Sequence, residues 1–122
     1  MKLIGIFAAA LIAGAGLNAR SAFAQSMKCE IGPITKSYGS TPWLVYGCDN
    51  AKSVVLVTAP GNPAMPFYFI FHPVDGAYRL EGEGTGDKSA TTNAVNELKQ
   101  LSESDIVALI EETRKVQNAP AR

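Results

Sequence analysis

The sequence of 122 residues is poor in the groups that most enzymes use, with one histidine and two cysteines. A histidine-based acid–base scheme could use only His72, which ends an apolar run and has no serine or cysteine motif beside it. Two cysteines and one histidine are also too few for a typical four-ligand zinc site. We therefore expect a protein that is not an enzyme and has no cofactor, with a small enzyme that uses His72 or a carboxylate in a pocket as an alternative.

An excess of charge is also missing, since 11 basic residues stand against 11 acidic ones. No basic run or stripe occurs, so we expect no binding to nucleic acid or to an anionic membrane surface. Carboxylates occur in pairs at Glu81 with Glu83 and at Glu111 with Glu112. Glycosidase chemistry needs two carboxylates across a cleft, and no part of the pattern predicts a cleft.

Charge is absent from Leu3 to Leu17, a run of fifteen residues that follows Lys2. The charged start, the short apolar run and the small residues that end at Ala24 are typical of a secretory signal peptide. A membrane anchor is the alternative, but fifteen helical residues span about 22 Å and a bilayer core is roughly 30 Å thick. We predict a signal peptide at 1–24 and one exported domain at 25–122, periplasmic or extracellular, without a membrane span.

Cys29 and Cys48 are the only cysteines, and export would bring them into an oxidising compartment where thiols pair. A small domain buries a modest share of its surface and gains from such a bond. Closing the loop between the two positions stabilises the fold by about 3 kcal/mol in the chain-entropy model. We predict a Cys29–Cys48 disulfide, with a free catalytic thiol as the alternative.

The first half of the exported domain is rich in β-branched and aromatic runs. These predict strands at 43–48, 53–58 and 67–72, with weaker strands at 28–36 and 77–81. The apolar period then changes to that of helices, one from Ser89 behind an Asp87 cap and one behind a Ser102 cap. Strands first and helices last predict an α+β fold, an antiparallel β-meander of four to five strands with two short C-terminal helices packed on one face.

The hairpin around Asp75-Gly76 predicts which side chains share a face. A four-residue turn would pair His72 with Ala77, and therefore Phe71 with Tyr78. The large apolar side chains Phe67, Phe69 and Phe71 then lie on one face of the sheet. Tyr68, Ile70 and His72 lie on the other.

Residues 82–89 read Gly-Glu-Gly-Thr-Gly-Asp-Lys-Ser and lie between a strand and a helix, as a phosphate loop would. A phosphate loop needs glycine at the sixth position, where this sequence has Asp87. That carboxylate would face the anion. We therefore expect no nucleotide binding, and we interpret the glycines as the end of a strand and Asp87 as a helix cap.

The strands at 43–48, 53–58 and 67–72 are apolar on both faces, whereas two helices can cover only one. Either the twisted sheet buries its second face on itself, or that face meets a partner. The candidate binding face consists of residue types that are common at interaction hot spots: Trp43, Tyr46, Tyr68, Ile70, His72 and Arg79. We expect a non-enzymatic binding or envelope-interaction protein, whose partner is an unknown protein or envelope component.

The stretch from Tyr46 to Ser53, Tyr-Gly-Cys-Asp-Asn-Ala-Lys-Ser, resembles the Tyr-x-Cys-Asp-x-Gly-x-Ser stretch of small periplasmic inhibitors of c-type lysozyme. Ala51 stands where glycine is usual in those inhibitors. They are exported, disulfide-bonded, all-β proteins. The resemblance implies an alternative function, inhibition of a secreted or cell-wall hydrolase.

Overall fold

The computed structural model describes residues 27–117. The predicted signal peptide and its cleavage near Ala24 lie outside this range. No helix within residues 27–117 combines the length and the apolar character that crossing a bilayer requires.

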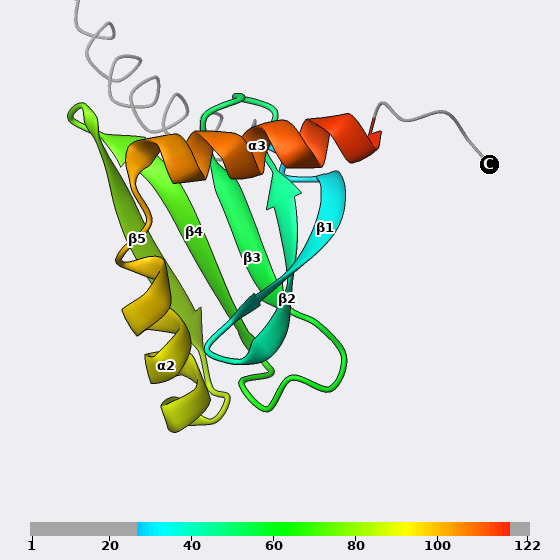
Figure 1. The fold of residues 1–122 in the computed structure, drawn as a ribbon, viewed down its shortest axis with the longest axis vertical. Coiled ribbons are helices and arrows are strands. Elements are labelled where there is room, and N and C mark those ends of the chain that lie inside the picture. The colour runs from blue at the N-terminus through cyan, green and yellow to red at the C-terminus, as the bar shows by residue number, and fades with distance from the viewer. Residues whose placement is uncertain (1–26, 118–122) are drawn as a thin grey trace, which may run out of the picture.

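Five antiparallel strands form one sheet in which each strand pairs with the next along the chain (Figure 1). Two helices follow and pack on the same face of that sheet. The predicted α+β meander is therefore confirmed. The elements are β1 (Ile31–Tyr38), β2 (Thr41–Gly47), β3 (Val54–Thr58), β4 (Phe67–Val74), β5 (Ala77–Gly84), α2 (Lys88–Leu98) and α3 (Glu103–Gln117).

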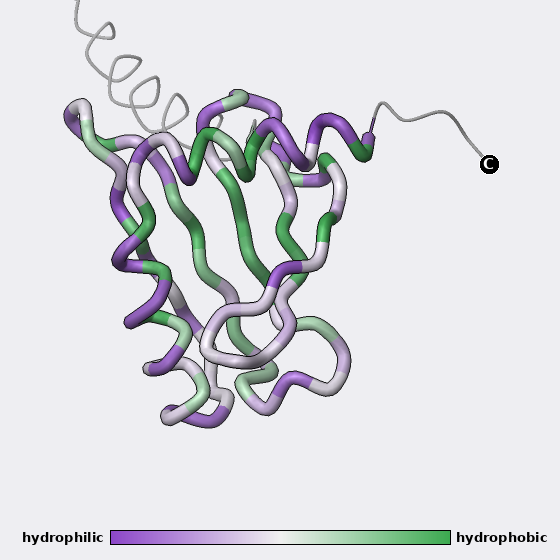
Figure 2. The backbone as a smooth tube through the Cα atoms, viewed as in Figure 1, coloured by the Kyte–Doolittle hydropathy of each residue, from purple (hydrophilic) through white to green (hydrophobic). Residues whose placement is uncertain are grey.

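The core lies between the sheet and the helices, and the two-residue period of the strands decides which side chains enter it. Green, hydrophobic stretches mark it in the inner strands and along the inner sides of the helices (Figure 2). Its largest fully buried side chains include Trp43 and Phe69, whose ring centroids are 5.1 Å apart. The strand side chains in the core are Tyr38, Trp43, Val45, Val54, Leu56, Phe69 and Phe71.

The turn between β4 and β5 is shorter than the sequence pattern predicted. Val74 pairs with Ala77, which leaves a two-residue turn at Asp75-Gly76. Both turn residues have positive φ, 53° and 83°, and Asp-Gly is a preferred pair for such a turn because its twist matches that of the strands. The predicted pairing of His72 with Ala77 is therefore wrong by two residues.

The predicted assignment of side chains to the two faces of β4 is correct despite this error in register. Phe71 lies opposite Leu80 instead of Tyr78, and Phe69 lies opposite Gly82. A shift of two residues keeps every side chain on its own face, whereas a shift of one would have exchanged the faces. Phe69 and Phe71 are buried as predicted, at 2% and 4% exposure.

Both helices begin as their sequences predicted. The Asp87 carboxylate accepts hydrogen bonds from the Ser89 hydroxyl at 2.7 Å and from the Ala90 N–H at 2.9 Å, and these bonds hold the pKa of Asp87 below its ordinary value. Ser102 and Asp105 form a reciprocal capping box, with bonds of 2.9 and 3.1 Å. Val107, which fitted the apolar period of α3, is instead 43% exposed. Thr113 is buried in α3, and its hydroxyl donates to the Ile110 carbonyl.

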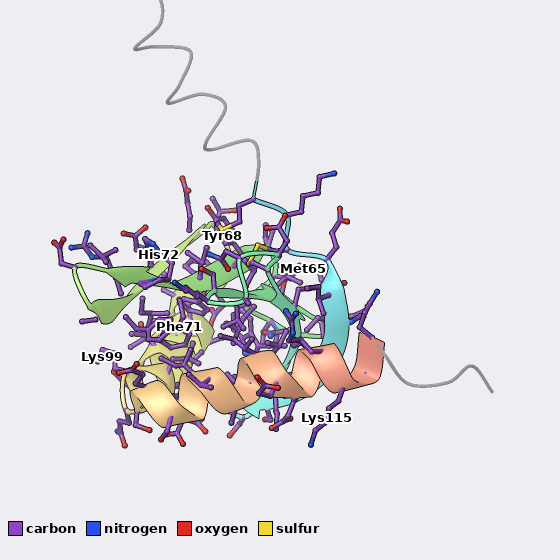
Figure 3. The ribbon with its side chains drawn as sticks, turned by 90° about the horizontal axis from the view of Figure 1, so that it is seen from above. Met65, Tyr68, Phe71, His72, Lys99 and Lys115 are labelled. Atoms are coloured by element: carbon purple, nitrogen blue, oxygen red, sulfur yellow. A yellow bond between two sulfur atoms is a disulfide. The ribbon has the colours of Figure 1, made fainter. Side chains whose placement is uncertain are left out.

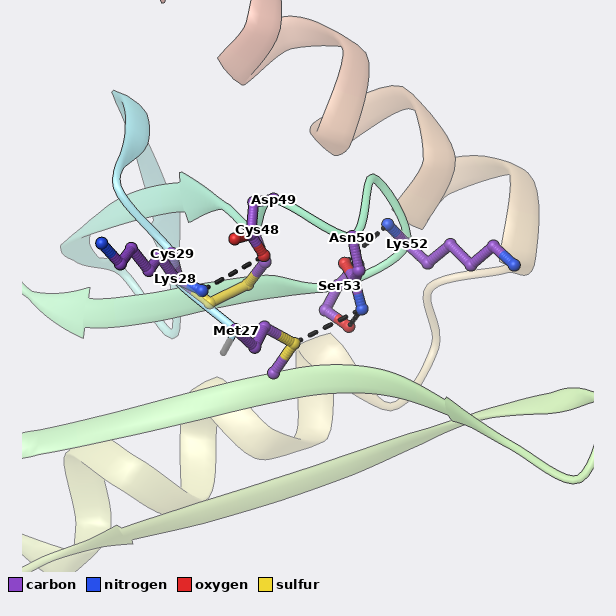
Figure 4. The surroundings of a disulfide bond; sticks show 8 residues. All are labelled: Met27, Lys28, Cys29, Cys48, Asp49, Asn50, Lys52 and Ser53. Atoms are coloured by element: carbon purple, nitrogen blue, oxygen red, sulfur yellow. Dashed lines mark hydrogen bonds between the residues drawn. A yellow bond between two sulfur atoms is a disulfide. The ribbon is translucent and has the colours of Figure 1, made fainter. Parts of the chain in front are cut away.

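A disulfide fastens the start of the described chain to the end of β2. Cys29 and Cys48 are bonded with an S–S distance of 2.05 Å, as predicted (Figure 4). Beside them the Asp49 N–H donates to the Lys28 carbonyl, and the Lys28 N–H donates to the Asp49 carboxylate. The segment before β1 is thus held by one covalent bond and two hydrogen bonds.

The buried side chain of Tyr38 makes the unfolding free energy depend on pH in the alkaline range. Its side chain is 7% exposed, and burial, with the carboxylates of Glu97, Glu112 and Asp105, raises the pKa of Tyr38 to about 12. The folded-state pKa lies above the ordinary value near 10, so the stabilisation is complete below pH 10 and is lost as the pH rises towards 12. The loss should amount to about 2–3 kcal/mol of unfolding free energy.

Tyr38→Phe should remove this part of the alkaline loss, because phenylalanine has no proton to release. Urea titrations of the two proteins between pH 7 and pH 12 would measure it. Equal slopes of unfolding free energy against pH in both proteins would show that Tyr38 does not titrate as described.

Candidate functional site

The sheet face away from α2 and α3 carries its own set of side chains, which we call the open face. Strand pairing aligns them in rows, with Leu44 beside Val57, Val57 beside Tyr68, and Tyr68 beside Glu83. A second row runs from Tyr46 through Val55 and Ile70 to Glu81. The open face comprises Leu44, Tyr46, Val55, Val57, Tyr68, Ile70, His72, Arg79, Glu81 and Glu83.

One end of the open face is covered by the segment that precedes β1. Cys48 and Ser53 are both fully buried there. Cys48 is bonded to Cys29 by the disulfide. The Asn50 side-chain amide donates a hydrogen bond to the Ser53 hydroxyl at 3.0 Å (Figure 4). The Met27 sulfur accepts a hydrogen bond from the same Asn50 amide. Along the rest of the face Tyr46, Val55, Val57 and Ile70 are half-buried, and Tyr68 is exposed.

Large hydrophobic side chains are exposed mainly on this side of the molecule. Tyr68 is 42% exposed, Met65 48% and Met27 38%, and the two other exposed large hydrophobic residues of the described chain lie on α3. Figure 3 shows Tyr68 and His72 on the side of the sheet away from α3, with Met65 nearby. Tyr68 and Met65, three residues apart in the chain, are thus exposed apolar side chains of the kind that interaction sites contain.

A shallow groove of about 410 Å³ opens beside Tyr68, where β3 ends and β4 begins. Apolar atoms provide most of its wall. The Tyr68 hydroxyl donates to the Glu83 carboxylate at 3.3 Å, so one hydroxyl and one carboxylate mark its rim. Its lining residues are Val57, Thr58, Pro66, Phe67, Tyr68, Glu83, Gly84 and Thr85.

The loop at 59–66, which borders the groove, is held rigidly by the side chain of Asn62. That side chain is 4% exposed, donates to the Pro42 carbonyl at 2.6 Å and accepts from the Ala64 N–H at 2.8 Å. The Thr85 N–H donates to the Pro66 carbonyl and fastens the far end of the loop. Met65 is thus presented to solvent by a backbone that is already ordered before any partner arrives.

His72, Arg79 and Glu81 form a charged corner of the open face. The His72 Nε2 atom lies 3.5 Å from the Glu81 carboxylate, and an Arg79 nitrogen lies 3.8 Å from it. The His72 Nε2 atom is nonetheless buried without a hydrogen-bond partner in the described chain, because the approach of Glu81 lacks hydrogen-bond geometry. The contact between His72 and Glu81 is therefore one of proximity without a hydrogen bond.

Five of the six residues of the predicted binding face lie on the open face: Tyr46, Tyr68, Ile70, His72 and Arg79. The sixth, Trp43, does not. It is fully buried under the helices, and its Nε1–H donates to the Tyr38 carbonyl at 3.1 Å. Strand alternation could have excluded it, because residues three apart point to opposite faces. The same alternation would have found Leu44 and Val57, but no sequence signal indicated Met65.

The glycines of residues 82–89 have packing roles. A Cβ atom at Gly82 would lie 2.6 Å from the ring of Phe69, and one at Gly84 would collide with Pro66 and Phe67. At Gly86 it would collide with the Ala64 backbone. Gly82 and Gly84 belong to β5, and Asp87 caps α2. These close contacts account for glycine at positions 82, 84 and 86 without a bound ligand.

The stretch from Tyr46 to Ser53 forms the end of β2, the disulfide and the turn into β3 (Figure 4). Asn50 orders that turn, because its carboxamide oxygen accepts from the N–H groups of Lys52 and Ser53. Ala51 has a φ of 61°, a left-handed conformation that glycine adopts more easily. Glycine at the matching position of the lysozyme inhibitors would suit the same turn.

Comparison with known proteins gives no relative: no family model, no curated protein and no solved structure matches this chain.

Tyr68 and Phe69 are neighbours in β4 that should respond differently to truncation. Tyr68→Ala removes a side chain from the open face and should change the unfolding free energy by no more than about 1 kcal/mol. Phe69→Ala leaves a cavity against Trp43 and should cost about 3–5 kcal/mol. Denaturant titrations of both variants measure the difference. Similar large losses at the two positions would mean that both faces of the sheet are buried.

Proposed function

We propose that the protein is a non-enzymatic binding protein that recognises a partner protein through the open face of its sheet. One observation carries this proposal. The exposed large hydrophobic side chains Tyr68 and Met65 adjoin an apolar groove on a face that no helix of the described chain covers. Tyrosine, methionine and arginine are enriched in protein interfaces, and Arg79 completes the set at the edge of this face.

The chemistry of the open face indicates what the partner presents. The apolar groove fits an aliphatic or aromatic anchor. Glu83 bonds Tyr68 but belongs to no ion pair within residues 27–117, so it can receive a basic group of the partner. The Asn62-pinned loop supplies Met65 at little entropic cost, because it is already ordered. The partner segment that suits this surface joins an apolar anchor to a lysine or arginine.

We place this binding outside the cytoplasm, in the periplasm or the extracellular space. The Cys29–Cys48 disulfide supports that location, because such bonds persist in oxidising compartments. The sequence pattern of a signal peptide at 1–24 agrees with it. An envelope protein or a secreted protein is therefore the kind of partner that we expect.

Inhibition of a secreted or cell-wall hydrolase is the narrower candidate function. The loop at 59–66 favours it, because an ordered loop with an exposed Met65 can enter an active-site cleft without first losing flexibility. The likeness of Tyr46–Ser53 to lysozyme inhibitors points the same way. This candidate requires that the bound partner be a hydrolase and lose activity.

The test is capture from an envelope extract with three matched baits. These are the wild-type protein, the open-face variant Tyr68→Ala/Arg79→Ala and the control variant Val107→Ala/Lys115→Ala, whose changes lie on α3. A partner of the open face should be retained by the wild type and the control, and should bind the open-face variant about tenfold more weakly or worse. Mass spectrometry identifies the partner, and titration of the purified partner measures the affinities.

The result of the capture experiment also distinguishes partner binding alone from inhibition of a hydrolase. Retention of the same proteins by all three baits, or of none by the wild type, would contradict the proposed function. A captured hydrolase that loses activity on addition of the wild type, and not of the open-face variant, would support inhibition. A captured partner without hydrolase activity would reject inhibition and leave the binding proposal standing.

A further inference from the structure

A second hollow lies on the helix side of the molecule, at the corner between the β4–β5 hairpin and the connection from α2 to α3. Its volume is about 410 Å³, within the range of roughly 300–1,000 Å³ that small-molecule sites occupy. We call it the corner pocket. It shares no residue with the groove beside Tyr68.

The floor of the corner pocket consists of core side chains. Leu98 is fully buried, Ile106 is 2% exposed and Phe71 is 4% exposed, yet each forms part of the pocket wall. Leu80 and Leu101 extend this apolar surface towards the mouth. The apolar surface that a ligand can reach is therefore that of the half-buried Tyr78, Leu80 and Leu101, and an apolar group that displaced water from it would gain from the hydrophobic effect.

Local hydrogen bonds fix each wall of the corner pocket. The Lys99 and Leu101 N–H groups close the last turn of α2, and the capping box of Ser102 and Asp105 opens α3 directly afterwards. On the hairpin side the Tyr78 hydroxyl donates to the Lys52 carbonyl at 2.8 Å. The pocket is thus formed in advance by two walls that cannot easily collapse onto each other.

The mouth of the corner pocket carries charge. Lys99 and Glu103 lie there, both exposed, and Figure 3 shows Lys99 on the same side of the molecule as Phe71. A smaller hollow of about 270 Å³ on the other side of Tyr78 adds Lys52 and shares Glu103. None of these three side chains forms an ion pair within residues 27–117. The lining of the two hollows together thus has two ammonium groups, of Lys99 and Lys52, and the one carboxylate of Glu103.

We propose that the corner pocket binds a small amphiphile with an aliphatic chain and an anionic head group. The chain lies against Tyr78, Leu80 and Leu101, above the buried side chains of Phe71, Leu98 and Ile106. The head group lies at the mouth, near the ammonium groups of Lys99 and Lys52. Glu103 opposes the head group and limits the affinity.

Dodecanoate is the probe for this proposal, used below its micelle concentration with the disulfide-intact protein. NMR titration should show saturable shifts of the amides at 76–80 and 98–106. The apparent melting temperature should rise with ligand concentration, because a ligand that binds only the folded state stabilises it. Dodecylammonium tests the sign of the head group, and acetate tests the need for the chain. Both should bind much more weakly than dodecanoate.

Matched charge variants test the role of the mouth. Lys99→Glu should weaken dodecanoate binding by about fivefold or more, and Glu103→Gln should strengthen it by a smaller factor. Lys115→Glu makes the same charge change on α3 outside the pocket and should bind as the wild type does. All three positions are exposed, so these variants should fold.

Three results would overturn the proposal. They are the absence of saturable binding, equal affinity for dodecylammonium and dodecanoate, and equal weakening by Lys99→Glu and Lys115→Glu. Shifts confined to the amides around Val57 and Tyr68 would also overturn it, since the amphiphile would then occupy the open-face groove. The proposed function is independent of these results, because the open-face variant leaves the corner pocket intact.

Discussion

The contact between the rings of Trp43 and Phe69, 5.1 Å apart, belongs to the buried cluster that joins the sheet to its helices. Gly82 makes it possible, because any side chain opposite Phe69 would enter the space of its ring. The Trp43 indole is fixed in turn by its bond to the Tyr38 carbonyl at the β1–β2 turn. Leu98 of α2 and Ile106 of α3 belong to the same buried cluster. Much of the large apolar volume thus lies on one side of the sheet.

This one-sided core leaves no helix on the open face. The strands remain apolar there, with Leu44 and Val57 half-buried and Tyr68 exposed in a row that ends at Thr35 on one side and Glu83 on the other. The disulfide and Met27 cover one end of this face, and the pinned loop borders the other. A surface that is apolar, ordered and accessible is suited to binding. The proposed function depends on that asymmetry.

Sequence patterns predicted the fold because its signals are local. Alternation gave the strands, capping residues gave the helix starts, and the two cysteines left one possible pairing. Alternation also predicted the faces of β4 correctly, although the predicted hairpin register was wrong by two residues. That register assumed a four-residue turn, whereas Asp-Gly favours a two-residue turn. The residue type of Trp43 is typical of a binding face, whereas its position in β2 places it in the core. The groove and the corner pocket were not predictable, because each joins segments whose meeting is decided by packing over long distances in the chain.

Hydroxyl-radical footprinting tests the central claim of the account, that one face of the sheet is open and the other is covered. The protein is oxidised briefly in solution, and mass spectrometry measures the extent of modification at each side chain. Tyr68 and Met65 should be modified rapidly, whereas Trp43 and Phe69 should stay protected until the protein unfolds. Protection of Tyr68 equal to that of Trp43 in the free protein would contradict an open face.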